Sequence, residues 1–193
     1  MRTSESSLRH DPVSRPDAQR AFRQAPLAML LATGFGAGLS PVAPGTAGSL
    51  VGLAMGLGIA FSLSSGSGPS VLAAVGLLMS GLAVSFVGVA ASSRACRALS
   101  AEDPGCVVID EIAGQLLASA PVPLFAFASS RGALLAWGLS FVAFRVFDIW
   151  KPGPVRRLQE LPEGWGVVLD DVAAGLLAAG TVAAACLAGL ARL

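Results

Sequence analysis

Five carboxylates stand at the edges of long apolar segments, where hydropathy alone would not place them. They are Asp110, Glu111, Asp148, Asp170 and Asp171. A carboxylate in or near hydrocarbon is costly unless it meets a cation, a partner or water. If these acids converge, they form an oxygen-rich cluster of the kind that binds hard divalent cations, Mg²⁺ above all. The sequence therefore predicts a magnesium site built from the ends of apolar helices.

Helix capping is the alternative explanation for these acids. Negative charge at a helix N-terminus is favoured by about 0.3–1 kcal/mol, and this could explain Asp110 and Asp170, which we expect to open their helices. Capping explains less well why a second acid follows each of them directly. It cannot explain Asp148, which we expect at the end of a helix. We therefore prefer the metal-cluster interpretation.

An internal repeat supports that interpretation. Residues 107–118 read VVIDEIAGQLLA and residues 167–178 read VVLDDVAAGLLA, with seven of the twelve positions identical. Identities between Leu or Ala residues often arise by chance in apolar sequence. The evidence for a repeat therefore lies in the aligned pairs of acids. Small residues (Gly114, Ala174 and Gly175) follow about one turn beyond the acids, where they would let two helices approach closely.

Cationic side chains near the acids could bind phosphate beside a metal ion. Lys151 follows Asp148 by three residues, just before prolines that end the segment. Arg145 and Arg156 lie on either side of Lys151 and could assist it. The alternative is that Lys151 and Arg156 are headgroup-level cations that only set the membrane topology.

A glycine-rich loop supplies a second phosphate-binding candidate. Residues 34–49 read GFGAGLSPVAPGTAGS and lead directly into an apolar segment. Backbone N–H groups at a helix N-terminus, with the hydroxyls of Thr46 and Ser49, would form an anion-binding turn. A purely structural turn is the alternative.

The elements that must position these residues are membrane helices. Of the 193 residues, 54% are hydrophobic and 13% are charged, whereas roughly a quarter are charged in soluble domains. Residues 24–93 contain no Asp, Glu, Lys or Arg. That stretch is long enough for two bilayer crossings at about 20 residues each. We therefore expect an all-α integral membrane protein.

The apolar runs predict a polytopic helical bundle with four or five membrane segments. These cover about 49–65, 70–91, 106–128, 132–149 and 167–190. Residues 27–38 are too short to span, so we expect them to be half-inserted or packed against the other helices. Residues 1–25 are expected to form a polar, disordered cytoplasmic tail, and residues 26–193 a single helical membrane domain.

Positive charge predicts the orientation of this bundle. With the N-terminal tail inside, ten of the thirteen Lys and Arg residues lie on the cytoplasmic side, and Arg131 and Arg192 lie opposite. All five acids then fall at the cytoplasmic ends of the helices.

Composition also excludes several kinds of protein. A net charge of +1 without a basic, aromatic-rich cluster gives no reason to expect nucleic acid as a partner. Cys96, Cys106 and Cys186 lack the paired spacing of disulfide frameworks or zinc sites. The single histidine, His10, lies in the tail, so a histidine base or nucleophile is not expected. No protein partner can be inferred.

Four motifs together resemble the phosphatidylglycerophosphatase A family of bacterial membrane phosphatases. They are GFGAGLSPVAPGTAGSL (34–50), IDEIAGQ (109–115), FRVFDIWKPGPVR (144–156) and GWGVVLDDVAAG (164–175). They occur in the family's order and cover the chain from about Leu27 to its end. One departure is Gly153, where the family's pattern has an aromatic residue between two prolines.

The resemblance implies a Mg²⁺-dependent enzyme of the bacterial inner membrane, with its active site on the cytoplasmic side. Its reaction would be hydrolysis of phosphatidylglycerophosphate, a phospholipid in the membrane, to phosphatidylglycerol and inorganic phosphate. By position, the metal ligands would be Asp110, Glu111, Asp148, Asp170 and Asp171. The catalytic acids would be Asp110, Glu111, Asp170 and Asp171, one of them a general base for water. Substrate would be bound by Lys151, Thr46, Ser49, Arg145 and Arg156.

Two other functions use similar residues. An ion or proton transporter also carries intramembrane acids, but near the midplane of the bilayer, whereas all five acids here lie at one interface. A phosphotransferase that moves a lipid headgroup would show a D-G-x2-A-R…D-x3-D pattern, which is absent.

Overall fold

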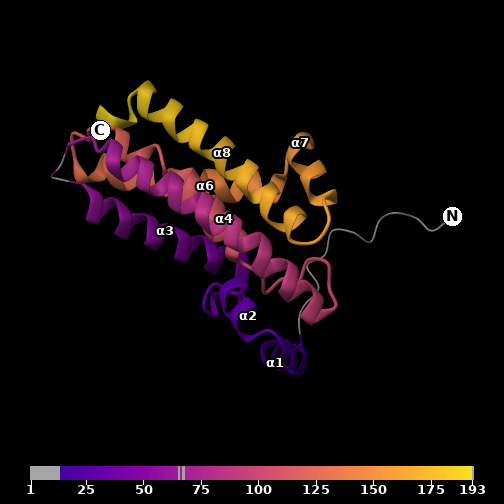
Figure 1. Cartoon of the computed structure of the whole chain (residues 1–193). Helices are drawn as coiled ribbons and strands as arrows, with labels where there is room; N and C mark the ends of the chain where they lie inside the picture. The colour runs from indigo at the N-terminus through magenta and orange to yellow at the C-terminus, as the bar shows by residue number, and fades with distance from the viewer. Residues whose placement is uncertain (1–13, 65, 67, 193) are drawn as a thin grey trace.

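The computed structural model describes residues 14–64, 66 and 68–192, and these residues form helices joined by turns (Figure 1). No strand occurs among them. The α-helices are α1 (Arg15–Gln24), α2 (Pro26–Ala32), α3 (Pro44–Leu63), α4 (Val71–Leu99), α5 (Ile109–Ser119), α6 (Ser130–Trp150), α7 (Gly153–Arg156) and α8 (Gly164–Ala188). The expectation of an all-α fold is confirmed.

Four of these helices are long and apolar enough to cross a membrane. They are α3, α4, α6 and α8, each of 20 residues or more. Their outward faces carry large apolar side chains, such as Phe61 and Phe86, as expected of helices that face lipid. This confirms the four spans expected around 49–65, 70–91, 132–149 and 167–190, although α3 and α8 begin several residues earlier than the sequence indicated.

The structure has no continuous helix over 106–128, where the sequence predicted a membrane-spanning segment. Helix α5 has only 11 residues, all of them buried, and packs against α3, α4, α6 and α8. It ends where Pro121 and Pro123 enter the chain, because a proline has no N–H for the helical ladder. Such a short helix with irregular backbone is tolerated at membrane depth only when protein surrounds it.

The chain beyond α5 nevertheless reaches the opposite end of the bundle. The Ser70 N–H, at the start of α4, donates to the Pro123 carbonyl (2.7 Å), and the Ala128 N–H donates to the Ala191 carbonyl (3.1 Å). Residues 109–129 therefore run the length of the bundle as a fifth pass, of which α5 is enclosed by the other four helices.

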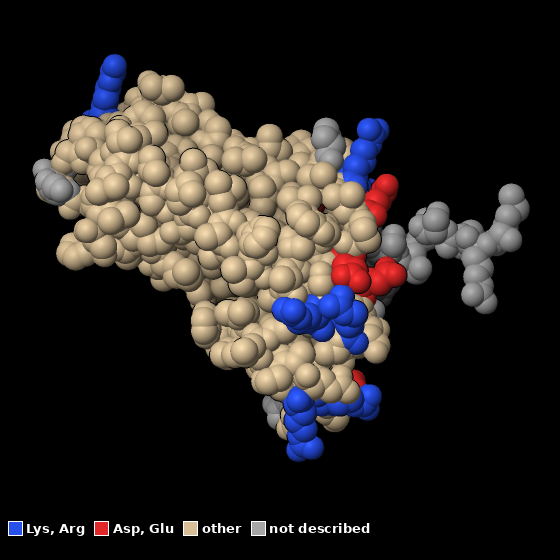
Figure 2. All heavy atoms as spheres, in the orientation of Figure 1, with Lys and Arg blue, Asp and Glu red and all other residues tan. Residues whose placement is uncertain are grey.

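The two ends of the bundle differ in charge. Figure 2 shows acidic and basic side chains gathered where α4 ends and α8 begins, and basic side chains near α1, with little charge at the opposite end of this face. Helices α3, α5 and α8 begin at the charged end, and α4 and α6 finish there. Every sequence-predicted site residue is therefore brought to one end of the molecule.

The N-terminal region is more ordered than the sequence indicated. Residues 15–24 form α1, which corrects the expectation of a disordered tail there; Ser14 caps this helix by accepting from the Asp17 N–H. Residues 1–13 of that tail lie outside the described residues. Helix α2 has seven residues, too few to span, and packs against α4 through buried Met29 and Ala32, as expected for residues 27–38.

Candidate active site

Asp110 and Glu111 lie in the first turn of α5, where the helix dipole favours negative charge. The preceding residue, Val108, has a non-helical φ of −141°, and its N–H donates to the Ala32 carbonyl at the end of α2 (2.8 Å). This contact fixes where α5 begins. Both carboxylates are 8% exposed, so the dipole is only part of what must stabilise them.

Asp170 and Asp171 come from α8, which crosses α5 at very close range. A methyl group at Gly175 would lie 2.5 Å from the Gly114 carbonyl oxygen, and one at Gly114 would lie 2.7 Å from the Asp171 carbonyl oxygen. The small residues therefore permit the close approach that the repeat predicted. Helix α8 begins at Gly164, so Asp170 is in its second turn and is not an N-terminal cap.

Three carboxylates converge into a buried cluster. Oxygens of Asp110, Glu111 and Asp171 all lie within 4.8 Å of one another. One oxygen of each residue (Oδ1 of Asp110, Oε2 of Glu111 and Oδ2 of Asp171) is buried and has no hydrogen-bond partner among the described residues. Three buried acids with unpartnered oxygens repel one another unless a cation lies between them. The donor set fits a metal ion such as Mg²⁺.

The other two predicted acids hold cations instead. Asp170 accepts from Lys151 (Nζ–Oδ2 2.5 Å), and Asp148 pairs with Arg145 (2.6 Å), with Lys151 at 3.9 Å. The five acids therefore divide into a cluster of three and two ion-paired residues beside it. Whether Asp148 and Asp170 also contact a metal ion stays a prediction.

Lys151 links α6 to α8 at the edge of the cluster. It is the C-cap of α6 in the left-handed conformation (φ 43°), which a residue other than glycine adopts at a cost of about 1–3 kcal/mol. Burial alone would lower the pKa of Lys151, but the charges of Asp170 and Asp171 raise it above the usual value for lysine. Lys151 is therefore a fixed positive charge next to three carboxylates.

The glycine-rich loop reaches the same place through the start of α3. A methyl group at Gly45 would lie 2.3 Å from Oε1 of Glu111 and 3.3 Å from Nη1 of Arg145. Ser49 donates to the Gly45 carbonyl (2.9 Å) and accepts from Arg145 Nη1 (3.3 Å). Thr46 is half-buried one residue after Gly45. The loop therefore packs directly on the carboxylate cluster.

Arg156 is the predicted site residue that the structure leaves apart. It is exposed at the end of α7, and no ion pair recorded among the described residues involves it. Its part in substrate binding stays a prediction.

The sequence analysis missed a polar network beneath the cluster. Gln115, one turn beyond Glu111, donates to Ser119 (3.0 Å) and to Ser140 of α6 (3.3 Å), and all three are fully buried. The sequence did contain a sign of this network, because a spacing of four puts residues 111, 115 and 119 on one face of α5. The network holds α5 against α6 below the acids.

Comparison with known proteins identifies the family of this chain. The family model described as phosphatidylglycerophosphatase A matches residues 30–186. The chain belongs to this family. It is therefore a membrane phosphatase that acts on a lipid phosphate. The matched range contains every acid of the site and the glycine-rich loop.

Relatives of the phosphatidylglycerophosphatase A family cover most of the chain. A protein of that name from Escherichia coli K12 is 34% identical over 152 residues, 78% of each chain. Another from Haemophilus influenzae is 35% identical over 152 residues, 77% of this chain and 82% of the relative. A Bacteroides thetaiotaomicron protein, provisionally named a phosphatidylinositol-3-phosphatase, is 35% identical over 150 residues, 78% of this chain and 87% of the relative. No solved structure is significantly similar to the chain.

Proposed function

We propose that this protein hydrolyses the terminal phosphate of phosphatidylglycerophosphate to give phosphatidylglycerol and inorganic phosphate, and that it requires Mg²⁺. The observation that carries the proposal is the buried cluster of Asp110, Glu111 and Asp171 with its unpartnered oxygens. The names of the Escherichia coli and Haemophilus influenzae relatives support this choice of lipid.

The metal and the carboxylates divide the chemistry between them. Mg²⁺, when held by Asp110, Glu111 and Asp171, supplies positive charge that neutralises the phosphoryl oxygens. One carboxylate among Asp110, Glu111, Asp170 and Asp171 accepts the proton of the attacking water. The water oxygen then forms a bond to phosphorus and the bond from phosphorus to the ester oxygen breaks. That oxygen takes up the proton held by the carboxylate and leaves as the hydroxyl of the product lipid.

The cations beside the cluster bind the terminal phosphate or the neighbouring phosphodiester of the substrate. Lys151, whose pKa is raised by its acidic neighbours, keeps its proton and therefore acts as a binding group rather than as an acid. Arg145 lies on the opposite side of Asp148 and offers several N–H donors in a planar arrangement that matches phosphate oxygens. Thr46 and Ser49 would add hydroxyls from the start of α3.

The site is proposed to face the cytoplasm at the bacterial inner membrane. Basic residues at the acid-bearing end outnumber those at the opposite end, where Arg131 and Arg192 lie. An excess of Lys and Arg marks the cytoplasmic side of membrane proteins. The acyl chains of the substrate would stay in the bilayer while its phosphate reaches the aqueous surface.

A phosphatidylinositol 3-phosphate phosphatase is the second candidate, because the Bacteroides thetaiotaomicron relative carries that name at equal identity. Both lipids present a phosphate monoester beyond a phosphodiester, so the same cluster suits either.

One assay separates these possibilities. Purified protein in detergent micelles is given each lipid in turn, and phosphate release is measured with EDTA and again after excess Mg²⁺ is added. We expect release from phosphatidylglycerophosphate that EDTA abolishes and Mg²⁺ restores. Release that EDTA does not affect would contradict the metal requirement. Release only from phosphatidylinositol 3-phosphate would replace the proposed substrate by the second candidate.

A further inference from the structure

A shallow, open depression along the outer face of α6, here named the α6 groove, lies beside the active site. It has a volume of about 650 Å³ and is lined by Phe141, Val142, Arg145, Val146, Ile149 and Trp150. These positions share one helix face, because they recur at intervals of about four residues. From Phe141 to Ile149 the helix rises about 12 Å, close to the thickness of one hydrocarbon leaflet, about 15 Å. The groove therefore runs in the direction of a lipid acyl chain.

The groove is exposed to the membrane and apolar except at one point. Val142, Val146 and Ile149 are each more than half exposed, and Trp150 lies at the end of the helix where aromatic residues meet the lipid headgroups. Arg145 is the exception: it is the one charged residue in the groove lining. Its charge is already compensated in part by Asp148, at 2.6 Å, as a cation at the membrane boundary requires.

Arg145 connects the groove to the carboxylate cluster. Its side chain is 18% exposed, and its Nη1 contacts Asp148 and Ser49. A methyl group at Gly45 would lie near this same nitrogen and near Glu111, so Arg145 and Glu111 are both packed against the start of α3. A guanidinium carries five N–H donors. The contacts recorded for Arg145 among the described residues use Nη1, which leaves the other two nitrogens to donate to a phosphate.

We propose that the α6 groove holds an acyl chain of the substrate lipid, and that Arg145 binds the phosphodiester between its diacylglycerol and its headgroup. This inference rests on the proposed function, because a substrate with both a phosphodiester and a terminal phosphate is needed. With the diester held at the junction, the terminal phosphate extends toward Asp110, Glu111 and Asp171. The groove and Arg145 then set both the direction of approach and the preference for a lipid with two phosphates.

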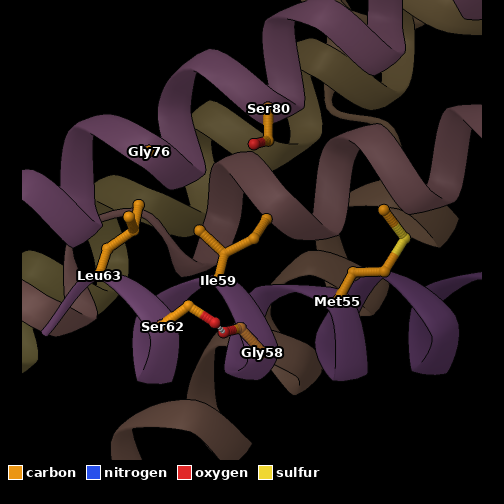
Figure 3. Close-up of a pocket in the computed structure, with 7 residues that line it drawn as sticks. All are labelled: Met55, Gly58, Ile59, Ser62, Leu63, Gly76 and Ser80. Atoms are coloured by element: carbon orange, nitrogen blue, oxygen red, sulfur yellow. Dashed lines mark hydrogen bonds between the residues drawn. The ribbon is translucent and has the colours of Figure 1, made fainter.

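A second membrane-facing groove provides an internal comparison. It lies between α3 and α4 at the end away from the acids, has a volume of about 470 Å³, and is lined by Met55, Gly58, Ile59, Ser62, Leu63, Gly76 and Ser80 (Figure 3). None of these seven residues is charged, so this groove offers nothing to complement a phosphate. Filling it should leave substrate selection unaffected.

Val146→Trp tests whether the α6 groove holds an acyl chain. The variant fills the α6 groove on its exposed side, and Gly58→Trp is the matched control, because a Cβ at Gly58 meets nothing within 4 Å. Specificity constants are compared for dipalmitoyl and dihexanoyl phosphatidylglycerophosphate in micelles with Mg²⁺. Val146→Trp should lower the ratio of kcat/KM for the long lipid over the short one by about fivefold, since packing in lipid rests on van der Waals contact. The control should change that ratio less than about twofold.

Arg145→Lys tests whether Arg145 binds the phosphodiester. Lysine keeps a positive charge for Asp148 but lacks the planar set of donors. The variant should lower kcat/KM for phosphatidylglycerophosphate more than for phosphatidic acid, which has a phosphate monoester but no diester. An equal loss on the two lipids would contradict binding of the diester by Arg145.

A labelling experiment gives a readout that does not need turnover. Phosphatidylglycerophosphate with a photoreactive diazirine at the end of one acyl chain is irradiated with the protein in EDTA. Wild type should be labelled within residues 141–150, and Val146→Trp much less. Labelling elsewhere, with an unchanged chain-length ratio, would overturn the groove assignment while wild-type turnover still supports the proposed function. No wild-type turnover of this lipid would overturn the proposed function and, with it, this assignment.

Discussion

The carboxylate of Asp171 lies in the buried cluster with Asp110 and Glu111, whereas that of Asp170, one residue earlier, pairs with Lys151. Successive residues of a helix point about 100° apart, so two neighbouring acids on α8 face different partners. The aligned pair on α5 behaves differently, because both Asp110 and Glu111 turn into the cluster. Lys151 is what distinguishes the two copies of the repeat.

Replacing each acid of α8 by its amide should separate their roles. Asp171→Asn removes a proposed metal ligand and should lower turnover by about 10²–10³-fold, the loss typical of a group that stabilises transition-state charge. Asp170→Asn weakens the hold on Lys151 and should lower turnover by about 10–100-fold. Turnover is measured as phosphate release in saturating Mg²⁺.

The matched control for both variants is Glu160→Gln, an exposed acid at the same end of the molecule. Thermal unfolding supplies the second measurement: Mg²⁺ should raise Tm in wild type and in Asp170→Asn, because a ligand that binds only the folded state stabilises it. It should not do so in Asp171→Asn. Normal turnover by Asp171→Asn would remove this residue from the proposed metal site.

At the residue scale, the sequence predicted which acids gather but not how they divide. Their types, spacing and repeat indicated a cluster, and all five do lie at one end of the bundle. The division depends on the rotation of α8 and on the left-handed backbone of Lys151, which is not a residue usually found there. Neither is encoded in spacing along the chain.

Two glycines fix the packing of helices around the cluster, and they do so against different atoms. At Gly175 the obstacle to a side chain is the backbone carbonyl of Gly114 on α5, and at Gly45 it is the flexible end of Glu111. A clash with backbone forces a helix to move, whereas a clash with a carboxylate only displaces that carboxylate. The two positions should therefore respond differently to the same substitution.

Gly175→Ala should destabilise the fold. The added methyl group must push α8 away from α5, which costs about 1–3 kcal/mol in a well-packed core and also separates Asp171 from Glu111. We expect a lower Tm together with lower turnover. Gly180→Ala on the same helix is the control, because a methyl group there meets nothing within 4 Å. Equal Tm values for the two variants would contradict the close crossing of α5 and α8.

Gly45→Ala should reduce turnover while leaving stability nearly unchanged. The methyl group would meet Oε1 of Glu111 at 2.3 Å, so the carboxylate must turn away from the cluster. We expect a higher Mg²⁺ concentration for half-maximal phosphate release and a Tm close to that of wild type. Gly58→Ala, which also lies on α3 but in open space, should behave as wild type in both measurements. A Mg²⁺ requirement unchanged from wild type would count against contact between Gly45 and a carboxylate of the proposed metal site.

At the element scale, hydropathy predicted the lipid-facing helices and misjudged the enclosed one. A window over 106–128 records apolar residues without recording whether lipid or protein surrounds them, and α5 is apolar because it is buried on every side. Pro121 and Pro123 were the available signal that no continuous helix crosses there. Helix α1 also had a visible signal, since Ser14, Pro16 and Asp17 form a helix start.

The whole molecule places its chemistry at one end and its lipid contacts along its sides. With the enclosed segment counted, five passes put α1 and the end of α8 at opposite ends of the bundle (Figure 1). The substrate fits this division, because its acyl chains are soluble only in the membrane and its phosphate only in water. An enzyme acting on such a lipid needs its charged groups where a lipid-facing groove meets the surface, and Arg145 lies at such a junction.

Cysteine labelling in bacterial spheroplasts tests the orientation of the whole molecule. The three native cysteines are buried and give little background, so single cysteines are introduced as Gly68→Cys, before α4, and Glu160→Cys, near the acids; both positions are exposed. Because basic residues cluster at the acid-bearing end, that end should be cytoplasmic. A membrane-impermeant thiol reagent should label Gly68→Cys in intact spheroplasts and Glu160→Cys only after the membrane is permeabilised. The opposite labelling pattern would place the carboxylate cluster outside the cytoplasm and contradict the proposed location of the reaction.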